Sequence, residues 1–212
     1  MVSTHFTLPE NITPISTEAD PLKLAGDLRT LCKKALDMGA AGAAVLSPGD
    51  LCFSDGKILE KMMQTDFPSI HWPLDYPIDD LKNTLFEYKK GIFVYIDADP
   101  DMPDYGGGPI ISPEHMAAYR KIHEIVSAVE AAAFYLGYYL AMGFAAGNCR
   151  SIFCAGETQC NAAGRGKGCI APYKGRPSLT AAGIDTRETA RKVHLSHLNT
   201  ERLFLSGLVM VA

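Results

Sequence analysis

The chain lacks an excess of positive charge and a long apolar run. It carries 20 basic and 24 acidic residues, for a formal net charge of −4. Nucleic-acid-binding surfaces are usually rich in clustered Lys and Arg, so we expect no nucleic-acid partner. The one candidate membrane span, the uncharged residues 131–147, is shorter than the about 20 apolar residues that span a bilayer. We expect no membrane span and interpret this run as a buried helix.

Targeting and common catalytic motifs are also missing. The first twenty residues have no apolar stretch of signal-peptide length, which predicts a cytoplasmic protein. The glycine-rich residues 164–168 do not form a Walker A loop, because neither Ser nor Thr follows Lys167. The chain has no G-x-S-x-G elbow and no H-E-x-x-H helix. These absences argue against the P-loop, serine-hydrolase and zinc-protease classes that such motifs define.

Cysteine is present, and its distribution is uneven. Four of the six cysteines, Cys149, Cys154, Cys160 and Cys169, fall within 21 residues. In a cytosolic chain of this size, such clustering favours metal binding over disulfides. The spacing C-x4-C-x5-C-x8-C matches neither a zinc ribbon nor a bacterial ferredoxin. Because zinc and iron–sulfur clusters both accept four thiolates, the residues predict a metal site and leave the metal open.

The residues around these cysteines strengthen the metal prediction. Glycines are frequent there; they permit sharp turns and leave backbone N–H groups free to point at sulfur. Arg150, Arg165 and Lys167 are predicted cofactor-binding residues, because nearby cations favour thiolates and stabilise a reduced cluster. Cys32 and Cys52 lie in apolar contexts and are predicted to be small core residues instead.

Hydrophobic periodicity alternates between helix and short strand. This pattern predicts an α/β fold, with α+β as the alternative: a single-domain mixed sheet flanked by helices. Residues 1–19 are predicted to be an N-terminal arm, and residues 20–212 one domain with a Cys-rich loop at 147–177. The predicted helices are 20–39, 78–90, 112–140 and 185–194, and the predicted strands are 43–46, 91–96, 143–147 and 203–211.

Three residues are candidates for proton transfer. Glu130 follows His123 and Ser127 along one line of the predicted long helix. Its apolar neighbours make a bare charge costly, so we expect an ion pair first, with an exposed edge or a proton carrier near the metal as alternatives. His71 and Tyr76 lie in a proline-rich segment that either lines a ligand site or forms a strap anchored on the core. Glu130, His71 and Tyr76 are therefore the catalytic candidates.

Four stretches of the chain resemble a known family. They are Tyr76-Pro77 with Tyr88-Lys89-Lys90-Gly91-Ile92, Ile122-His123-Glu124-Ile125-Val126 with Gly137-Tyr138-Tyr139, Ala146-Gly147-Asn148-Cys149-Arg150 with the three later cysteines, and Arg176-Pro177-Ser178-Leu179 with Gly183-Ile184-Asp185. Over residues 22–211 they resemble domain-of-unknown-function family 2284, a group of predicted metal-binding proteins common in anaerobes.

The resemblance implies a [4Fe–4S] cluster on Cys149, Cys154, Cys160 and Cys169, in an anaerobic setting. The chain departs from the family pattern in two ways. His71-Trp72-Pro73 stands where the family usually has Cys-Pro-Pro, so a second centre is expected to be absent. The spacings between the four cysteines are also longer than in the compact family pattern.

Three functions agree with these residues. The first is an electron-transfer protein with one [4Fe–4S] cluster, serving a partner redox enzyme or forming one of its subunits. The second is a reductase or lyase that uses the cluster at its substrate. The third is a non-enzymatic module held together by zinc. If the protein is an enzyme, it is expected to be an iron–sulfur oxidoreductase or its electron-transfer subunit, and a homo-oligomer is compatible with its apolar content.

Overall fold

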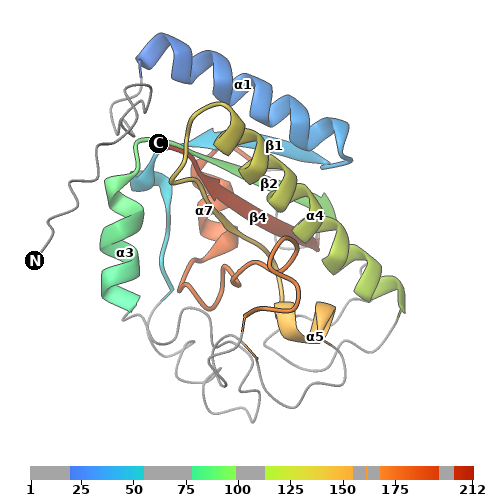
Figure 1. The fold of residues 1–212 in the computed structure, drawn as a ribbon. Coiled ribbons are helices and arrows are strands. Elements are labelled where there is room, and N and C mark those ends of the chain that lie inside the picture. The colour runs from blue at the N-terminus through green and yellow to red at the C-terminus, as the bar shows by residue number, and fades with distance from the viewer. Residues whose placement is uncertain (1–19, 55–77, 99–112, 155–160, 162–167, 196–202) are drawn as a thin grey trace, which may run out of the picture.

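A computed structural model describes residues 20–54, 78–98, 113–154, 161, 168–195 and 203–212 (Figure 1). The predicted N-terminal arm lies outside these residues. The helices are α1 (Pro21–Asp37), the 3-10 turn η1 (Pro48–Asp50), α3 (Ile78–Glu87), α4 (Pro113–Tyr135), α5 (Cys149–Phe153) and α7 (Thr186–Lys192). The strands are β1 (Gly42–Leu46), β2 (Gly91–Asp97), β3 (Met142–Phe144) and β4 (Phe204–Met210).

The described strands form one four-stranded sheet in the order β1-β2-β4-β3. Each of the three strand pairs is antiparallel. Strands β1 and β3 therefore lie at the two edges of the sheet. The last strand in the sequence, β4, lies inside the sheet between β2 and β3. The predicted α/β class is confirmed, and the antiparallel pairing corresponds to its α+β alternative.

Helices cover both faces of this sheet. In Figure 1, α1 and α4 lie in front of the strands and α7 lies behind them. Ile92 and Val94 of β2 belong to the core formed with α1 and α4, whereas Phe93 and Tyr95 belong to the core formed with α3 and α7. Because successive side chains point to opposite faces, a strand covered on both sides is apolar throughout. This explains the continuous apolar run that predicted β2.

Helix α1 begins and ends where its local signals predict. Asp20 is the N-cap, and its side chain accepts a hydrogen bond from the Leu22 backbone N–H at 2.9 Å. Pro21 occupies the first turn, where its missing N–H costs nothing. At the other end, Gly39 has a φ of 91°, which glycine adopts readily after a helix C-terminus.

Helix α4 is shorter than predicted. It ends at Tyr135, and Gly137 adopts a φ of 102°, so the chain turns there and continues into β3. The interpretation of residues 131–147 as a buried helix therefore holds only as far as Tyr135, because a glycine in the left-handed region ends the helix inside this run. The strand predicted at 143–147 is observed as β3. Within the described part of the chain, no helix is long and apolar enough to cross a membrane.

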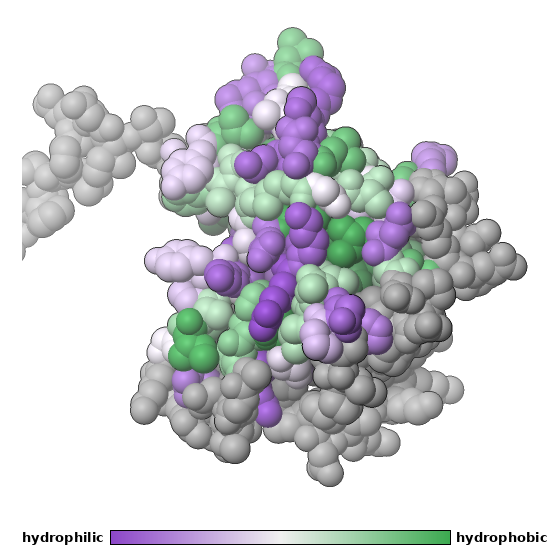
Figure 2. Space-filling view, turned by 90° about the vertical axis from the view of Figure 1, so that its right-hand side faces the viewer, coloured by the Kyte–Doolittle hydropathy of each residue, from purple (hydrophilic) through white to green (hydrophobic). Residues whose placement is uncertain are grey.

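The described surface is mixed in character. Four large apolar side chains are exposed around the end of α4: Phe134, Tyr135, Tyr139 and Leu140. Figure 2 shows a face of the molecule on which hydrophilic residues run through the middle and hydrophobic residues are scattered around them. The described part of this face therefore presents no single broad apolar area.

Candidate metal centre

A glycine and an asparagine bring the chain from β3 to the first clustered cysteine. Gly147 has a φ of 74°, and a Cβ at this position would lie 2.6 Å from two ring carbons of Tyr119. Only glycine fits this conformation and this space. The next residue, Asn148, is buried and caps α5, because its side-chain oxygen accepts a hydrogen bond from the Arg150 N–H at 3.0 Å. Cys149 is thereby fixed as the first residue of α5.

Three of the four predicted metal ligands lie in the described residues. Cys149 begins α5 and Cys154 is its C-cap residue, and both are half-buried thiols. Cys169 is an exposed thiol, and its Sγ accepts a hydrogen bond from the Ala171 N–H at 3.4 Å. Cys160 lies outside the described residues. In the part of the chain that the structure describes, no three His, Cys, Asp or Glu side chains come close enough to hold a metal ion. The four-cysteine ligand set therefore stays a prediction.

The residues beside the cysteines fit an anionic thiolate centre. Arg150 Nη1 and Asn161 Oδ1 are buried and have no hydrogen-bond partner among the described residues. Buried polar atoms are nearly always paired, so each such atom requires an explanation. A metal centre bound by thiolates carries negative charge, and a guanidinium N–H is a suitable partner for it. Thiol sulfur is also the donor type that zinc and iron–sulfur clusters prefer.

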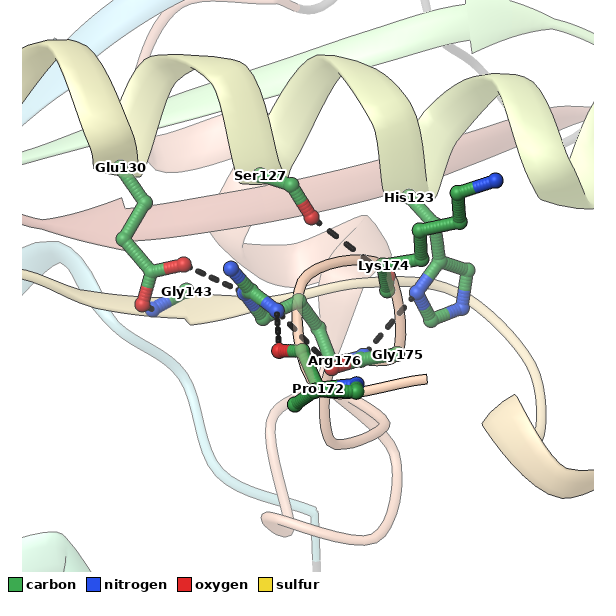
Figure 3. Close-up of polar contacts among 8 residues, drawn as sticks. All are labelled: His123, Ser127, Glu130, Gly143, Pro172, Lys174, Gly175 and Arg176. Atoms are coloured by element: carbon green, nitrogen blue, oxygen red, sulfur yellow. Dashed lines mark hydrogen bonds and ion pairs between the residues drawn. The ribbon is translucent and has the colours of Figure 1, made fainter. Parts of the chain in front are cut away.

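A polar line along α4 faces the loop that follows Cys169. His123, Ser127 and Glu130 all point from the helix toward residues 172–176 (Figure 3). Ser127 Oγ donates a hydrogen bond to the Lys174 carbonyl at 3.4 Å. The other two side chains both contact Arg176. The line predicted from helical spacing therefore exists, and it joins α4 to the loop.

Glu130 is an ion-paired side chain. One carboxylate oxygen accepts a hydrogen bond from the Gly143 N–H at 3.1 Å, and the other pairs with the Arg176 Nε. Arg176 Nη1 also donates to the carbonyls of Pro172 at 3.2 Å and Gly175 at 3.0 Å. The predicted ion pair is confirmed. A proton-carrying role for Glu130 stays a prediction.

His123 is buried completely, and both of its ring nitrogens are engaged. Nδ1 accepts a hydrogen bond from the Arg176 backbone N–H at 3.2 Å, so the ring proton is on Nε2. Nε2 lies 3.1 Å from the Ala146 carbonyl oxygen and donates to it. The ring also meets Phe153 edge-on, with the centroids 5.2 Å apart. Burial, with a smaller contribution from the nearby Arg176 charge, lowers the pKa of His123 from 6.5 to about 4, so the imidazole is neutral at pH 7.

We expect the buried imidazole to make folding stability depend on pH. Between pH 6.5 and about pH 4 an unfolded His123 binds a proton and the folded one does not. The unfolded state therefore binds more protons, and the free energy of unfolding falls as pH falls through this window, by about 3 kcal/mol in all. Urea unfolding at pH 7, 6 and 5, with a chelator present to remove metal effects, measures this slope. The His123→Gln variant should have a flatter slope, and equal slopes would contradict the prediction.

Other predicted site residues lie elsewhere. His71, Tyr76, Arg165 and Lys167 fall outside the described residues, so their roles stay predictions. Cys32 packs against the core, as predicted.

Sequence reasoning missed two features of the site. The first is the short helix α5, although an N-cap residue type at Asn148 was a usable signal. The second is the proximity of Gly175 to Cys149, which no local sequence pattern predicts. It joins two segments that are distant in the sequence.

The fold and the clustered thiols define a candidate metalloprotein of the α/β class. A family model described as "predicted metal-binding protein" matches residues 70–211. The chain belongs to this family, domain-of-unknown-function family 2284, and the resemblance is confirmed. The matched region runs from α3 to β4 and includes all four clustered cysteines. No curated protein and no solved structure matches the chain.

Proposed function

We propose that this protein binds one [4Fe–4S] cluster through Cys149, Cys154, Cys160 and Cys169 and transfers electrons to a partner redox enzyme or as one of its subunits. The observation that carries the proposal is the set of four cysteines within 21 residues, inside the region that matches a family described as predicted metal-binding proteins. Cysteine thiolates are the usual protein ligands of such clusters.

The charge around the cysteines fits a negatively charged thiolate centre such as a [4Fe–4S] cluster. Four thiolates on a cubane leave a net negative charge, which nearby cations stabilise. Arg150 has a buried Nη1 with no hydrogen-bond partner among the described residues, and Arg165 and Lys167 lie in the same loop of the sequence. A bound [4Fe–4S] cluster supplies one-electron transfer.

The chain's own residues contribute position and electrostatics. Gly147 and the Asn148 cap fix the start of α5, and α5 in turn fixes the directions of Cys149 and Cys154. Arg150, in the first turn of α5, supplies positive charge next to the first cysteine. Hydrogen bonds and charges of this kind set the potential of a cluster.

Metal analysis of anaerobically purified protein tests the proposal. We expect a brown protein with broad visible absorption that dithionite bleaches, and about four irons with matching sulfide per chain. Reoxidation by an added electron acceptor should restore the absorption. A colourless protein with one tightly bound zinc would overturn the proposal and make the cysteine loop a structural clip.

A further inference from the structure

The loop of residues 171–176 is held to α4 from several points. Glu130 pairs with the Arg176 side chain, His123 accepts from the Arg176 backbone N–H, and Ser127 donates to the Lys174 carbonyl. Arg176 in turn donates to two carbonyls of its own loop. His123 also contacts Ala146, so it connects this loop to the segment that leads into α5.

The same loop runs beside Cys149. A Cβ built on Gly175 would lie 3.4 Å from the Cys149 Cβ and 3.9 Å from its Sγ, so Gly175 faces this side chain across a space about the size of one methyl group. The Gly175 N–H donates to the Ala171 carbonyl at 2.9 Å, and the Ala171 N–H donates to Cys169 Sγ. A short run of backbone contacts therefore connects Cys149 to Cys169.

We propose that Glu130 and His123 are positioning residues, which act through Arg176 to hold the 171–176 loop over Cys149. They set how fast this cysteine loses its metal and how fast its thiol reacts with solutes. The metal part of this inference rests on the proposed function. The part on thiol reactivity rests only on the position of Gly175 beside Cys149.

The Glu130–Arg176 pair is the contact on which the loop depends most. The two side chains are 21% and 16% exposed, so water screens their attraction poorly. Removing one partner leaves the other as an uncompensated, largely buried charge. In Glu130→Gln, the Arg176 side chain would move into solvent. Its hydrogen bonds to the Pro172 and Gly175 carbonyls would then be lost. The loop would then separate from Cys149.

Two rates measured on the full-length protein as purified test the proposal. The first is the rate at which a chelator removes the metal, and the second is the rate at which iodoacetamide modifies each cysteine, read by peptide mass spectrometry. We expect Glu130→Gln to release metal about tenfold faster, the lower end of the effect of residues that orient metal ligands. Alkylation of Cys149 should accelerate several-fold, while that of Cys52 stays unchanged. The matched control is Glu124→Gln, an exposed acidic residue on the same helix, which should leave both rates as in wild type.

The alkylation rate of Cys52 distinguishes a positioning role of Glu130 from a general loss of stability. Unfolding exposes both cysteines, so a parallel rise in the alkylation of Cys149 and Cys52 would overturn the proposal. An unchanged Cys149 rate in Glu130→Gln would also overturn it. If Glu130→Gln does not fold, Arg176→Lys replaces it, because lysine keeps the charge but lacks the guanidinium that pairs with Glu130 through Nε while Nη1 donates to both carbonyls. The expected result is the same: selective acceleration at Cys149.

The outcome stays separable from that of the proposed function. If the wild-type protein contains zinc or no metal, the iron–sulfur proposal fails. The ratio of Cys149 to Cys52 alkylation still decides whether Glu130 positions the loop, and the same ratio in His123→Gln decides it for His123. A Ser127→Ala variant, which removes only the 3.4 Å contact to Lys174, should give a smaller change in the same direction.

Discussion

Replacing Cys149 with serine is expected to remove most of the bound metal. Serine keeps the size of the side chain but supplies a hard oxygen that ionises far less readily than a thiol. Residues that only orient metal ligands change metal affinity by about 10–100-fold, so the loss of a direct ligand should exceed about tenfold. The measurement is iron and zinc content per chain after anaerobic purification, together with the visible spectrum.

A second cysteine provides the control for this substitution. Cys52 is also half-buried but lies outside the cluster, and its backbone N–H donates to Thr189 Oγ1, a bond that serine would keep. Cys52→Ser should retain the full metal content. Unchanged metal content in Cys149→Ser would show that Cys149 is not a ligand.

Adding one methyl group at Gly207 is expected to destabilise the fold strongly. Gly207 is buried in β4, and a Cβ there would lie 2.2 Å from Val126 Cγ2 on α4 and 3.2 Å from Val94 Cγ2 on β2. Because cores are close-packed, α4 must move away from the sheet to make room. Overpacking of this kind costs up to about 3 kcal/mol, and we expect Gly207→Ala at this upper end. Urea unfolding of wild type and variant measures the loss.

Two further variants test the reason for this effect. Gly49 has open space around the position of a Cβ and no positive φ, so Gly49→Ala should change the free energy of unfolding little. Removing the clashing methyls with Val126→Ala should recover part of the loss in the Gly207→Ala background. If the two substitutions at 126 and 207 are additive, the clash with Val126 is not the cause.

Local sequence signals predicted several elements well. Asp20 and Pro21 begin α1, and Gly39 follows its end, because capping depends on residues that are neighbours in the chain. The apolar run in β2 also predicted a covered strand. It could not predict that β2 pairs with β1 and β4 in antiparallel register, because pairing depends on contacts between distant segments.

Where the signal was weak, the prediction was only partly right: the strand predicted at 143–147 is present as β3, but the helix predicted to end at residue 140 ends at Tyr135. The run 131–147 has the composition of a buried helix, yet Gly137 ends the helix and β3 follows. Because glycine occurs in both helices and turns, Gly137 by itself does not predict the end of the helix. The chain turns at Gly137 so that β3 can pair with β4, which is distant in the sequence. The short helix α5 was missed for a similar reason, since five residues carry little periodicity.

The chemistry of the candidate centre was determined by the sequence alone. Four cysteines in a glycine-rich, cationic loop predict a thiolate metal site whatever their final arrangement, because ligand type follows from residue type. Helical spacing also placed His123, Ser127 and Glu130 on one line of α4.

Only the tertiary structure decided what this line contacts. It brings Arg176 against Glu130 and His123, keeps the imidazole neutral by burial, and places Gly175 beside Cys149. These contacts join residues that are 26 to 53 positions apart in the chain, and no local periodicity encodes them. They form because β3 and the bridge between Ala145 and Ser178 bring both segments beneath α4, where buried polar groups must find partners.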